Sequence, residues 1–158
     1  MSGAFYPPPR TEPVPGGAYI AVAVVPIWRG ELVAFDVTAA GAEGRWFPWA
    51  PLPRGTEPWE AAAALAEEWC GADLAELRLV DAMGGEGLGG SWQLTLVFRA
   101  ELLAAPKGDP HRRPVLLPAQ PAEAVGGFAA ADLARWAGGD AGGGGLPPPA
   151  TQRPPLLF

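Results

Sequence analysis

The segment from Tyr19 to Val25, Tyr-Ile-Ala-Val-Ala-Val-Val, constrains the fold most strongly. It carries no charged residue and is rich in β-branched side chains, which is typical of a strand buried on both faces. Such a strand needs a layer of structure on each side of its sheet, because both apolar faces must be kept from water. We therefore expect a sheet that is covered on both faces.

The residues after this segment predict a hairpin. Arg29-Gly30 is typical of a tight turn, and Glu31 to Phe35 reads as the returning strand. Trp46-Phe47-Pro48-Trp49 then predicts a short aromatic strand, which its proline confines to a sheet edge.

An alanine-rich stretch gives the clearest element of the chain. Thr56 suits the N-cap, Glu57 and Pro58 suit the first turn, and residues 59–70 favour a helix. Gly71 is placed to end it in the left-handed conformation. On a helical wheel the apolar stripe contains Ala61, Ala62, Leu65 and Trp69, and it excludes Glu60, Glu67 and Glu68.

The second half of the chain predicts three more strands and a second helix. The strands are Leu77–Val80, the alternating segment Trp92–Arg99, which reads as half-buried, and Val115–Leu117; the helix is Ala130–Trp136. A polar loop, Lys107–Arg113, precedes the last strand. This order lacks regular βαβ alternation, so it predicts a mixed β-sheet flanked by two helices, an α/β/α or α+β layer fold.

Composition limits the size of the core. Leu, Ile, Val and Phe make up only about 22% of the chain, just above the level below which a chain cannot bury enough apolar surface to fold. These residues gather in one domain, 17–137. A Pro-rich arm (1–16) precedes it and a Gly/Pro-rich tail (138–158) follows, and both read as extended segments without a core.

Charge and cysteine content narrow the function classes. The formal net charge of −6 argues against binding a nucleic acid polymer or an anionic membrane, but not against a small phosphorylated ligand. The single cysteine, Cys70, excludes an internal disulfide. The first residues lack the pattern of a signal peptide. These features favour a soluble, cytoplasmic protein, and they leave a homodimer open.

The segment Leu52-Pro-Arg-Gly-Thr-Glu-Pro-Trp-Glu-Ala-Ala-Ala-Ala-Leu-Ala-Glu-Glu-Trp-Cys-Gly71 resembles the helix motif of the Nudix family, G-x5-E-x7-R-E-U-x-E-E-x-G-U, where U is a bulky apolar residue. The hairpin before it, the strand from Gln93 to Glu101 and the segment 127–136 resemble the elements that surround the motif. The resemblance covers roughly residues 17–137. It implies a Nudix-like α/β/α sandwich.

The resemblance also implies a function. It implies Mg²⁺-dependent hydrolysis of a nucleoside diphosphate linked to another group, because clustered carboxylates hold the ion that neutralises phosphate charge. Glu67 and Glu68 are the catalytic and metal-binding candidates, and Glu60 is a further metal candidate. The implied partner is a small phosphorylated ligand or nucleotide.

The segment departs from the motif at several positions: without gaps, Trp49 falls on the leading glycine and Gly55 on the loop glutamate, and Gly71 lies one residue late. When Glu67 and Glu68 are placed on the paired glutamates, Ala63 and Ala64 stand where the motif has Arg-Glu. The leading hypothesis is therefore a Nudix-type hydrolase with a weakened or lost catalytic motif. The alternative is a non-catalytic Nudix-fold module that binds nucleotides or regulates, and a third is an interaction protein that uses the Pro-rich ends.

Other features have simpler interpretations. The glycine-rich segment 84–90 lacks the residues of a P-loop and reads as a flexible connection, although its Glu86 could approach a metal. The basic group His111-Arg112-Arg113 could touch a ligand phosphate or form a solvated loop. Cys70 is best explained as a packed helix-end residue. Trp46 and Trp49 favour core packing over base stacking.

Overall fold

The computed structural model describes residues 18–40, 42–86 and 92–138. The predicted arm, the tail beyond Gly138 and residues 87–90 of the glycine-rich segment lie outside them, so the predicted domain limits stay predictions. The elements are β1 Ala18–Trp28, β2 Glu31–Val37, β3 Gly44–Trp46, β4 Trp49–Pro51, α1 Pro58–Cys70, β5 Leu74–Glu86, β6 Trp92–Leu102, β7 Arg112–Leu117 and α2 Ala130–Ala137.

The strands form one mixed sheet in the order β3-β2-β1-β6-β5, with β4 on β1 and β7 on β2. Strand β1 pairs in parallel with β6 from Ala18–Trp92 to Ile27–Glu101, and the other pairings are antiparallel. The predicted hairpin is confirmed. Arg29 and Gly30 have φ values of 50° and 80°, the left-handed pair that a two-residue turn requires.

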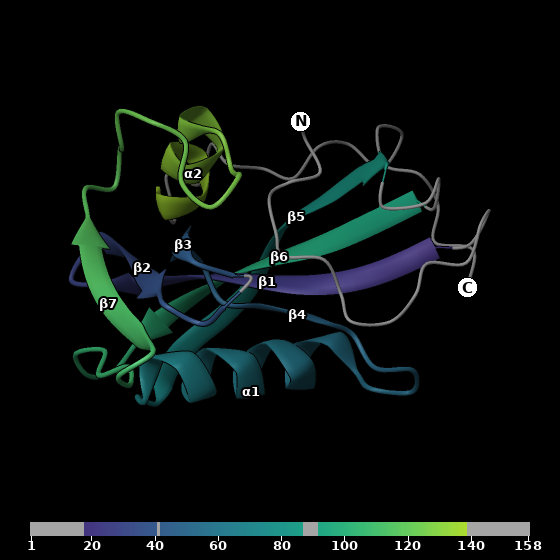
Figure 1. The fold of residues 1–158 in the computed structure, drawn as a ribbon, viewed down its shortest axis with the longest axis horizontal. Coiled ribbons are helices and arrows are strands. Elements are labelled where there is room, and N and C mark those ends of the chain that lie inside the picture. Colours follow the sequence, from purple (N-terminus) through teal and green to yellow (C-terminus); the bar gives the residue numbers. More distant parts are fainter. Residues whose placement is uncertain (1–17, 41, 87–91, 139–158) are drawn as a thin grey trace.

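Helices cover both faces of this sheet, α1 below and α2 above in Figure 1. Successive residues of β1 alternate between the two faces: Val22 and Val24 belong to one buried cluster, Ala23 and Val25 to the other. The prediction of a sheet buried on both sides is confirmed, and the architecture is the predicted α/β/α sandwich.

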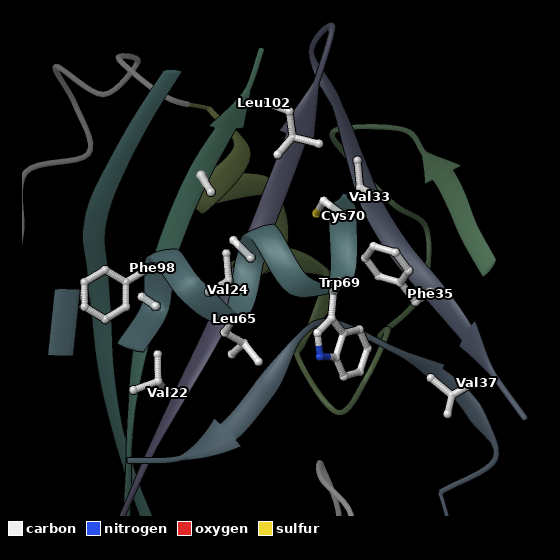
Figure 2. Packing of buried hydrophobic residues seen from close by; sticks show 13 residues of the cluster. Val22, Val24, Val33, Phe35, Val37, Leu65, Trp69, Cys70, Phe98 and Leu102 are labelled. Atoms are coloured by element: carbon white, nitrogen blue, oxygen red, sulfur yellow. The ribbon is translucent and has the colours of Figure 1, made fainter. Parts of the chain in front are cut away.

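A buried cluster between α1 and the strands holds this helix against the sheet (Figure 2). Leu65 and Trp69 point from α1 toward the strands, and the Trp69 ring meets Phe35 edge to face with centroids 5.4 Å apart. Phe98 packs on Trp59 in the same way, at 5.1 Å. Aromatic pairs of this geometry stabilise beyond the area they bury.

The N-cap of α1 lies one residue later in the chain than the sequence predicted. Glu57, not Thr56, is the N-cap, and its carboxylate accepts hydrogen bonds from the backbone N–H groups of Trp59 and Glu60. The longer side chain satisfies two donors at the helix start that would otherwise lack partners, which explains the shift. Gly71 ends the helix at φ 61°, as predicted.

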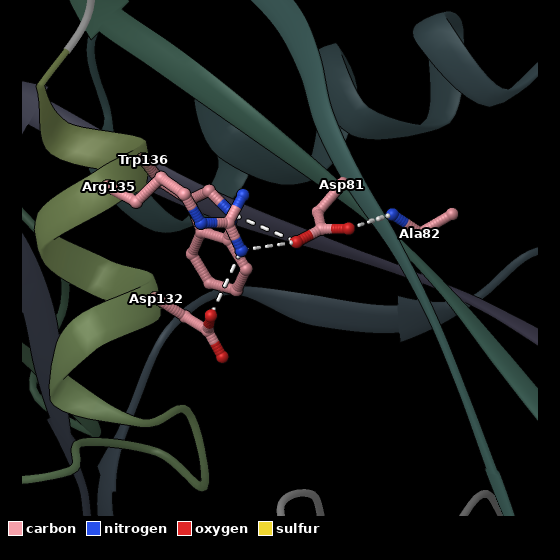
Figure 3. Close-up of polar contacts among 5 residues, drawn as sticks. All are labelled: Asp81, Ala82, Asp132, Arg135 and Trp136. Carbon is pink, nitrogen blue, oxygen red and sulfur yellow. Dashed lines mark hydrogen bonds and ion pairs between the residues drawn. The ribbon is translucent and has the colours of Figure 1, made fainter. Parts of the chain in front are cut away.

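Helix α2 is fixed by polar contacts with β5, shown in Figure 3. The Asp81 carboxylate accepts hydrogen bonds from Arg135 Nη2 at 2.8 Å and Trp136 Nε1 at 3.2 Å. Arg135 also donates to Asp132 at 2.9 Å. Beneath these groups, Trp136 and Phe128 are buried with their rings edge to face.

Several strand predictions need correction. The aromatic segment is divided between β3 and β4, because Pro48 cannot donate a ladder hydrogen bond, although its carbonyl accepts one from Val24 N–H. The alternating segment in β6 is not half-buried: Thr95, Val97 and Arg99 are buried, because the second face of the sheet is covered too.

Two loop predictions also need correction. Strand β5 extends through Glu86, and β7 begins at Arg112, so the predicted loops at 84–90 and 107–113 are each partly strand. Within the described parts of the chain, no helix is long and apolar enough to cross a membrane.

Candidate ligand site at helix α1

The three acidic candidates lie on the solvent side of α1. Glu60, Glu67 and Glu68 are exposed, whereas the buried residues of the helix are Ala62, Leu65, Ala66, Trp69 and Cys70. The two alanines at the Arg-Glu positions of the motif are not equivalent. Ala63 is half-buried and Ala64 is exposed, so the latter leaves the side of the helix near Glu68 without a carboxylate.

An arginine from a strand distant in the sequence contacts one of these carboxylates, that of Glu68. Arg112, the first residue of β7, donates from Nη1 to Glu68 Oε2 at 3.1 Å. Its guanidinium carbon lies 4.5 Å from the centroid of the Trp69 ring, in cation–π geometry. The Arg112 side chain is 28% exposed and the Glu68 side chain 62%. The guanidinium therefore stays accessible to a ligand while it neutralises one carboxylate.

The loop before β7 fixes the position of Arg112. The Asp109 carboxylate accepts from the backbone N–H groups of His111 and Arg112 at 2.7 and 3.0 Å, which forms an Asx turn. Gly108, at φ 66°, lies so close to Arg112 that an added Cβ would clash with the Arg112 carbonyl oxygen. Lys107 N–H donates to the Cys70 carbonyl at 2.7 Å, which ties the loop to the end of α1.

More basic groups lie beside Arg112. His111 and Arg113 are exposed, and Arg113 pairs with Asp36 in the β2–β7 ladder. A hydrogen bond from Arg45, at 2.7 Å, lowers the pKa of Asp36, and the charge of Arg113 acts in the same direction. The predicted basic group is thus a turn and strand start beside α1, not a detached loop.

These residues do not fit a cluster of divalent metal ions. Within the described residues, no group of three or more His, Cys, Asp or Glu side chains comes together in a way that could hold one. Glu68 already has a cation, Glu57 caps the helix, and Ala64 supplies no ligand. The side chain of Glu86 lies outside the described residues. Glu60, Glu67 and Glu68 therefore remain predicted ligands.

Two other candidates have structural positions. Cys70 is buried, and burial raises the pKa of its thiol to about 12, so the thiol stays protonated near neutral pH. Trp46 and Trp49 pack against the buried clusters, and Trp46 Nε1 donates to the Ala42 carbonyl at 2.9 Å. Core packing, the favoured interpretation for both tryptophans, agrees with these contacts.

Sequence reasoning could not find the contact between Arg112 and Glu68. The two residues are far apart in the chain, and only the β2–β7 pairing and the loop at Gly108 bring them together. The basic group itself was visible in the sequence, but its neighbour was not.

No protein-family model and no curated protein matches this sequence. Solved structures resemble its fold. A Nudix hydrolase from Nitrosomonas europaea has a TM-score of 0.59 at 15% identity, covering 87% of this chain and 97% of that one. An ADP compounds hydrolase has a TM-score of 0.52 at 19% identity, covering 63% and 57%. A mutant of the Bacillus subtilis pyrophosphohydrolase BsRppH has a TM-score of 0.52 at 19% identity, covering 61% of each chain.

The fold is therefore the α/β/α sandwich of Nudix hydrolase structures. The matched region spans less than two thirds of the ADP compounds hydrolase and of the Bacillus protein. At these identities the likeness defines the architecture, and the activity has to be argued from the residues of this chain.

Proposed function

We propose that this protein binds a small phosphorylated ligand of the nucleotide class beside α1, and that it lacks efficient hydrolysis of that ligand. The observation that carries the proposal is the 3.1 Å contact between Arg112 and Glu68, on a helix that has alanines at two motif positions. An arginine supplies positive charge where a hydrolase of this fold is expected to use metal ions.

The chemistry of phosphate recognition supports binding. A guanidinium presents paired N–H donors that match phosphate oxygens. Arg112 is held in place by the Trp69 ring and the Asp109 turn, so little of its freedom remains to be lost when a ligand binds. Exposed His111 adds a donor on the same turn.

The chemistry of hydrolysis argues against an efficient enzyme. Cleaving a phosphoanhydride requires neutralisation of charge that develops in the transition state, and clustered carboxylates normally achieve this through bound metal. The described part of α1 provides no such cluster. Binding without turnover is what the remaining groups support.

Thermal unfolding with a panel of phosphorylated compounds tests the proposal. The panel contains ADP, ADP linked to a sugar, nucleoside triphosphates and inorganic phosphate, each with Mg²⁺ and with EDTA. We expect at least one nucleotide to raise Tm in both conditions and the shift to disappear in Arg112→Gln. Arg29→Gln, which removes an exposed arginine at the β1–β2 turn, is the matched control. Stabilisation that strictly requires metal, or none at all, would contradict the proposal.

A residual Nudix-type hydrolase is the second candidate. It is favoured by the exposure of Glu60, Glu67 and Glu68 along one helix, where they remain accessible to Mg²⁺. Its test is release of phosphate or nucleoside monophosphate from the same panel with Mg²⁺. Turnover that Glu68→Gln abolishes would establish the hydrolase. Turnover that survives both Glu67→Gln and Glu68→Gln would point to a contaminating enzyme.

A further inference from the structure

We infer that Arg112 is the resident counter-ion of Glu68 and excludes divalent cations from the Glu67–Glu68 pair. The inference concerns the site of the proposed function and explains its poor fit to metal. It implies a latent divalent-cation site on α1 that a single substitution would open.

The contact has the geometry of a true ion pair. Nη1 lies 3.1 Å from Oε2, within the distance of a hydrogen bond between opposite charges, and the guanidinium lies over the indole of the next residue, Trp69. A pair of exposed charges would usually be weakly held. Here the Trp69 ring is itself fixed against Phe35, so the cation rests on a rigid support.

The backbone around Arg112 leaves it little freedom to withdraw. Its N–H is bound by the Asp109 carboxylate, and its carbonyl oxygen accepts from Asp109 N–H at 2.9 Å. Residue 108 has to be glycine to avoid that carbonyl, and Lys107 anchors the loop to α1. The ion pair thus joins two anchored elements and not two flexible side chains.

Electrostatics then determines which cation the carboxylate can hold. A divalent ion on Glu68 would stand next to a fixed guanidinium, and like charges at contact distance repel strongly where solvent is partly excluded. Ala64 offers no additional carboxylate to offset that repulsion. Glu67 precedes Glu68 in the helix and is also exposed, so its carboxylate could join that of Glu68 around an ion once the guanidinium is gone.

Mn²⁺ binding without any nucleotide tests the inference. Free Mn²⁺ is followed by electron paramagnetic resonance, and Tm is measured in parallel, for the wild type and Arg112→Gln. We expect the variant to bind Mn²⁺ at least about tenfold more tightly than the wild type. Arg113→Gln removes the same formal charge from the adjacent position and should bind like the wild type. Adding Glu68→Gln to Arg112→Gln should abolish the gain.

Arg112→Met provides a second route if the glutamine variant folds poorly, because its unbranched side chain can still pack on Trp69 without a charge. Equal Mn²⁺ affinity in the wild type and both Arg112 variants, whether tight or absent, would overturn the inference. So would an equal gain in Arg113→Gln, which would reduce the effect to net charge. Because no nucleotide is present, these outcomes leave the proposed ligand binding to its own test.

Discussion

Helix α1 has thirteen residues and a side-chain cap at its N-terminus, whereas α2 has eight residues and its N-cap residue, Ala129, makes no side-chain hydrogen bond. The longer helix is stabilised by local features of its own sequence: Glu57, Pro58 and Gly71. The shorter one depends on partners distant in sequence, chiefly Asp81 on β5. A helix that is secured locally can vary its outer face, which is the face that carries Glu67, Glu68 and the contact with Arg112.

The largest effect should come from removing the aromatic anchor of α2. Trp136 is 2% exposed, so Trp136→Ala should lower the free energy of unfolding by about 3–5 kcal/mol, through lost burial and a cavity. Trp59 on α1 is 45% exposed, and Trp59→Ala should cost clearly less. Urea denaturation measures both. Equal losses of unfolding free energy in the two variants would show that α2 depends no more on Trp136 than α1 does on Trp59. Trp136→Phe, which keeps a ring, should be milder.

The loop between β6 and β7, which is hydrogen-bonded to the end of α1, should be the next most sensitive region. Gly108→Ala requires φ 66° and brings a Cβ within 2.6 Å of Pro114, so we expect a loss of about 2–4 kcal/mol. Gly30→Ala also requires a positive φ but meets nothing within 4 Å, so it should cost only about 1–2 kcal/mol. Denaturant midpoints compare the two. A loss at Gly108 no larger than at Gly30 would mean that the loop yields easily, and that Arg112 is less firmly held.

Removing the side-chain cap of α1, or adding one to α2, should make the N-termini of the two helices more alike in stability. Glu57→Ala removes the acceptor for two N–H groups of α1 and should cost about 1 kcal/mol. Ala129→Ser adds an acceptor at the start of α2 and should gain about 0.5–1 kcal/mol. Calorimetric Tm values report both, with Glu123→Ala in an exposed loop as control. A neutral Glu57→Ala would show that α1 is held by packing alone.

The smallest effect concerns pH at the edge of the sheet, where Asp36 of β2 pairs with Arg45 of β3. The Arg45 hydrogen bond lowers the pKa of Asp36, so the pair stabilises the fold above the unfolded pKa near 3.8 and loses this contribution as pH falls through the folded value. Asp36 is 37% exposed, so the effect should stay under about 1 kcal/mol. Asp36→Asn should make unfolding less sensitive to pH below 4. An unchanged pH profile would show that the Asp36–Arg45 pair does not contribute to the pH dependence of stability.

Local sequence signals predicted the elements well where one residue type decides the outcome. The alanine tract and Gly71 located α1, and the uncharged run in β1 required cover on two faces. The cap was misplaced by one residue, because a glutamate can reach donors that a threonine hydroxyl usually serves. The double burial of β6 was missed, because Thr95 and Arg99 are polar residues on a covered face.

The candidate site was predictable only in its parts. Glu67 and Glu68 were identified through the resemblance of α1 to a known motif, and the basic residues were visible as a group. Their meeting depends on strand pairing and on one close approach at Gly108, neither of which has a local signature. The same is true of Asp81, whose partners lie on the last helix.

The parallel pairing of β1 with β6 has a consequence for the order in which the chain acquires its structure. Ala18 has no partner on that side until Trp92 has been made, and Ile27 waits for Glu101. During synthesis the most apolar strand is therefore complete long before its neighbour exists, while its hairpin with β2 can form at once. Long-range pairing of this kind slows folding and leaves a bare strand edge exposed to other chains. We expect the nascent chain to need protection on the ribosome until β6 emerges.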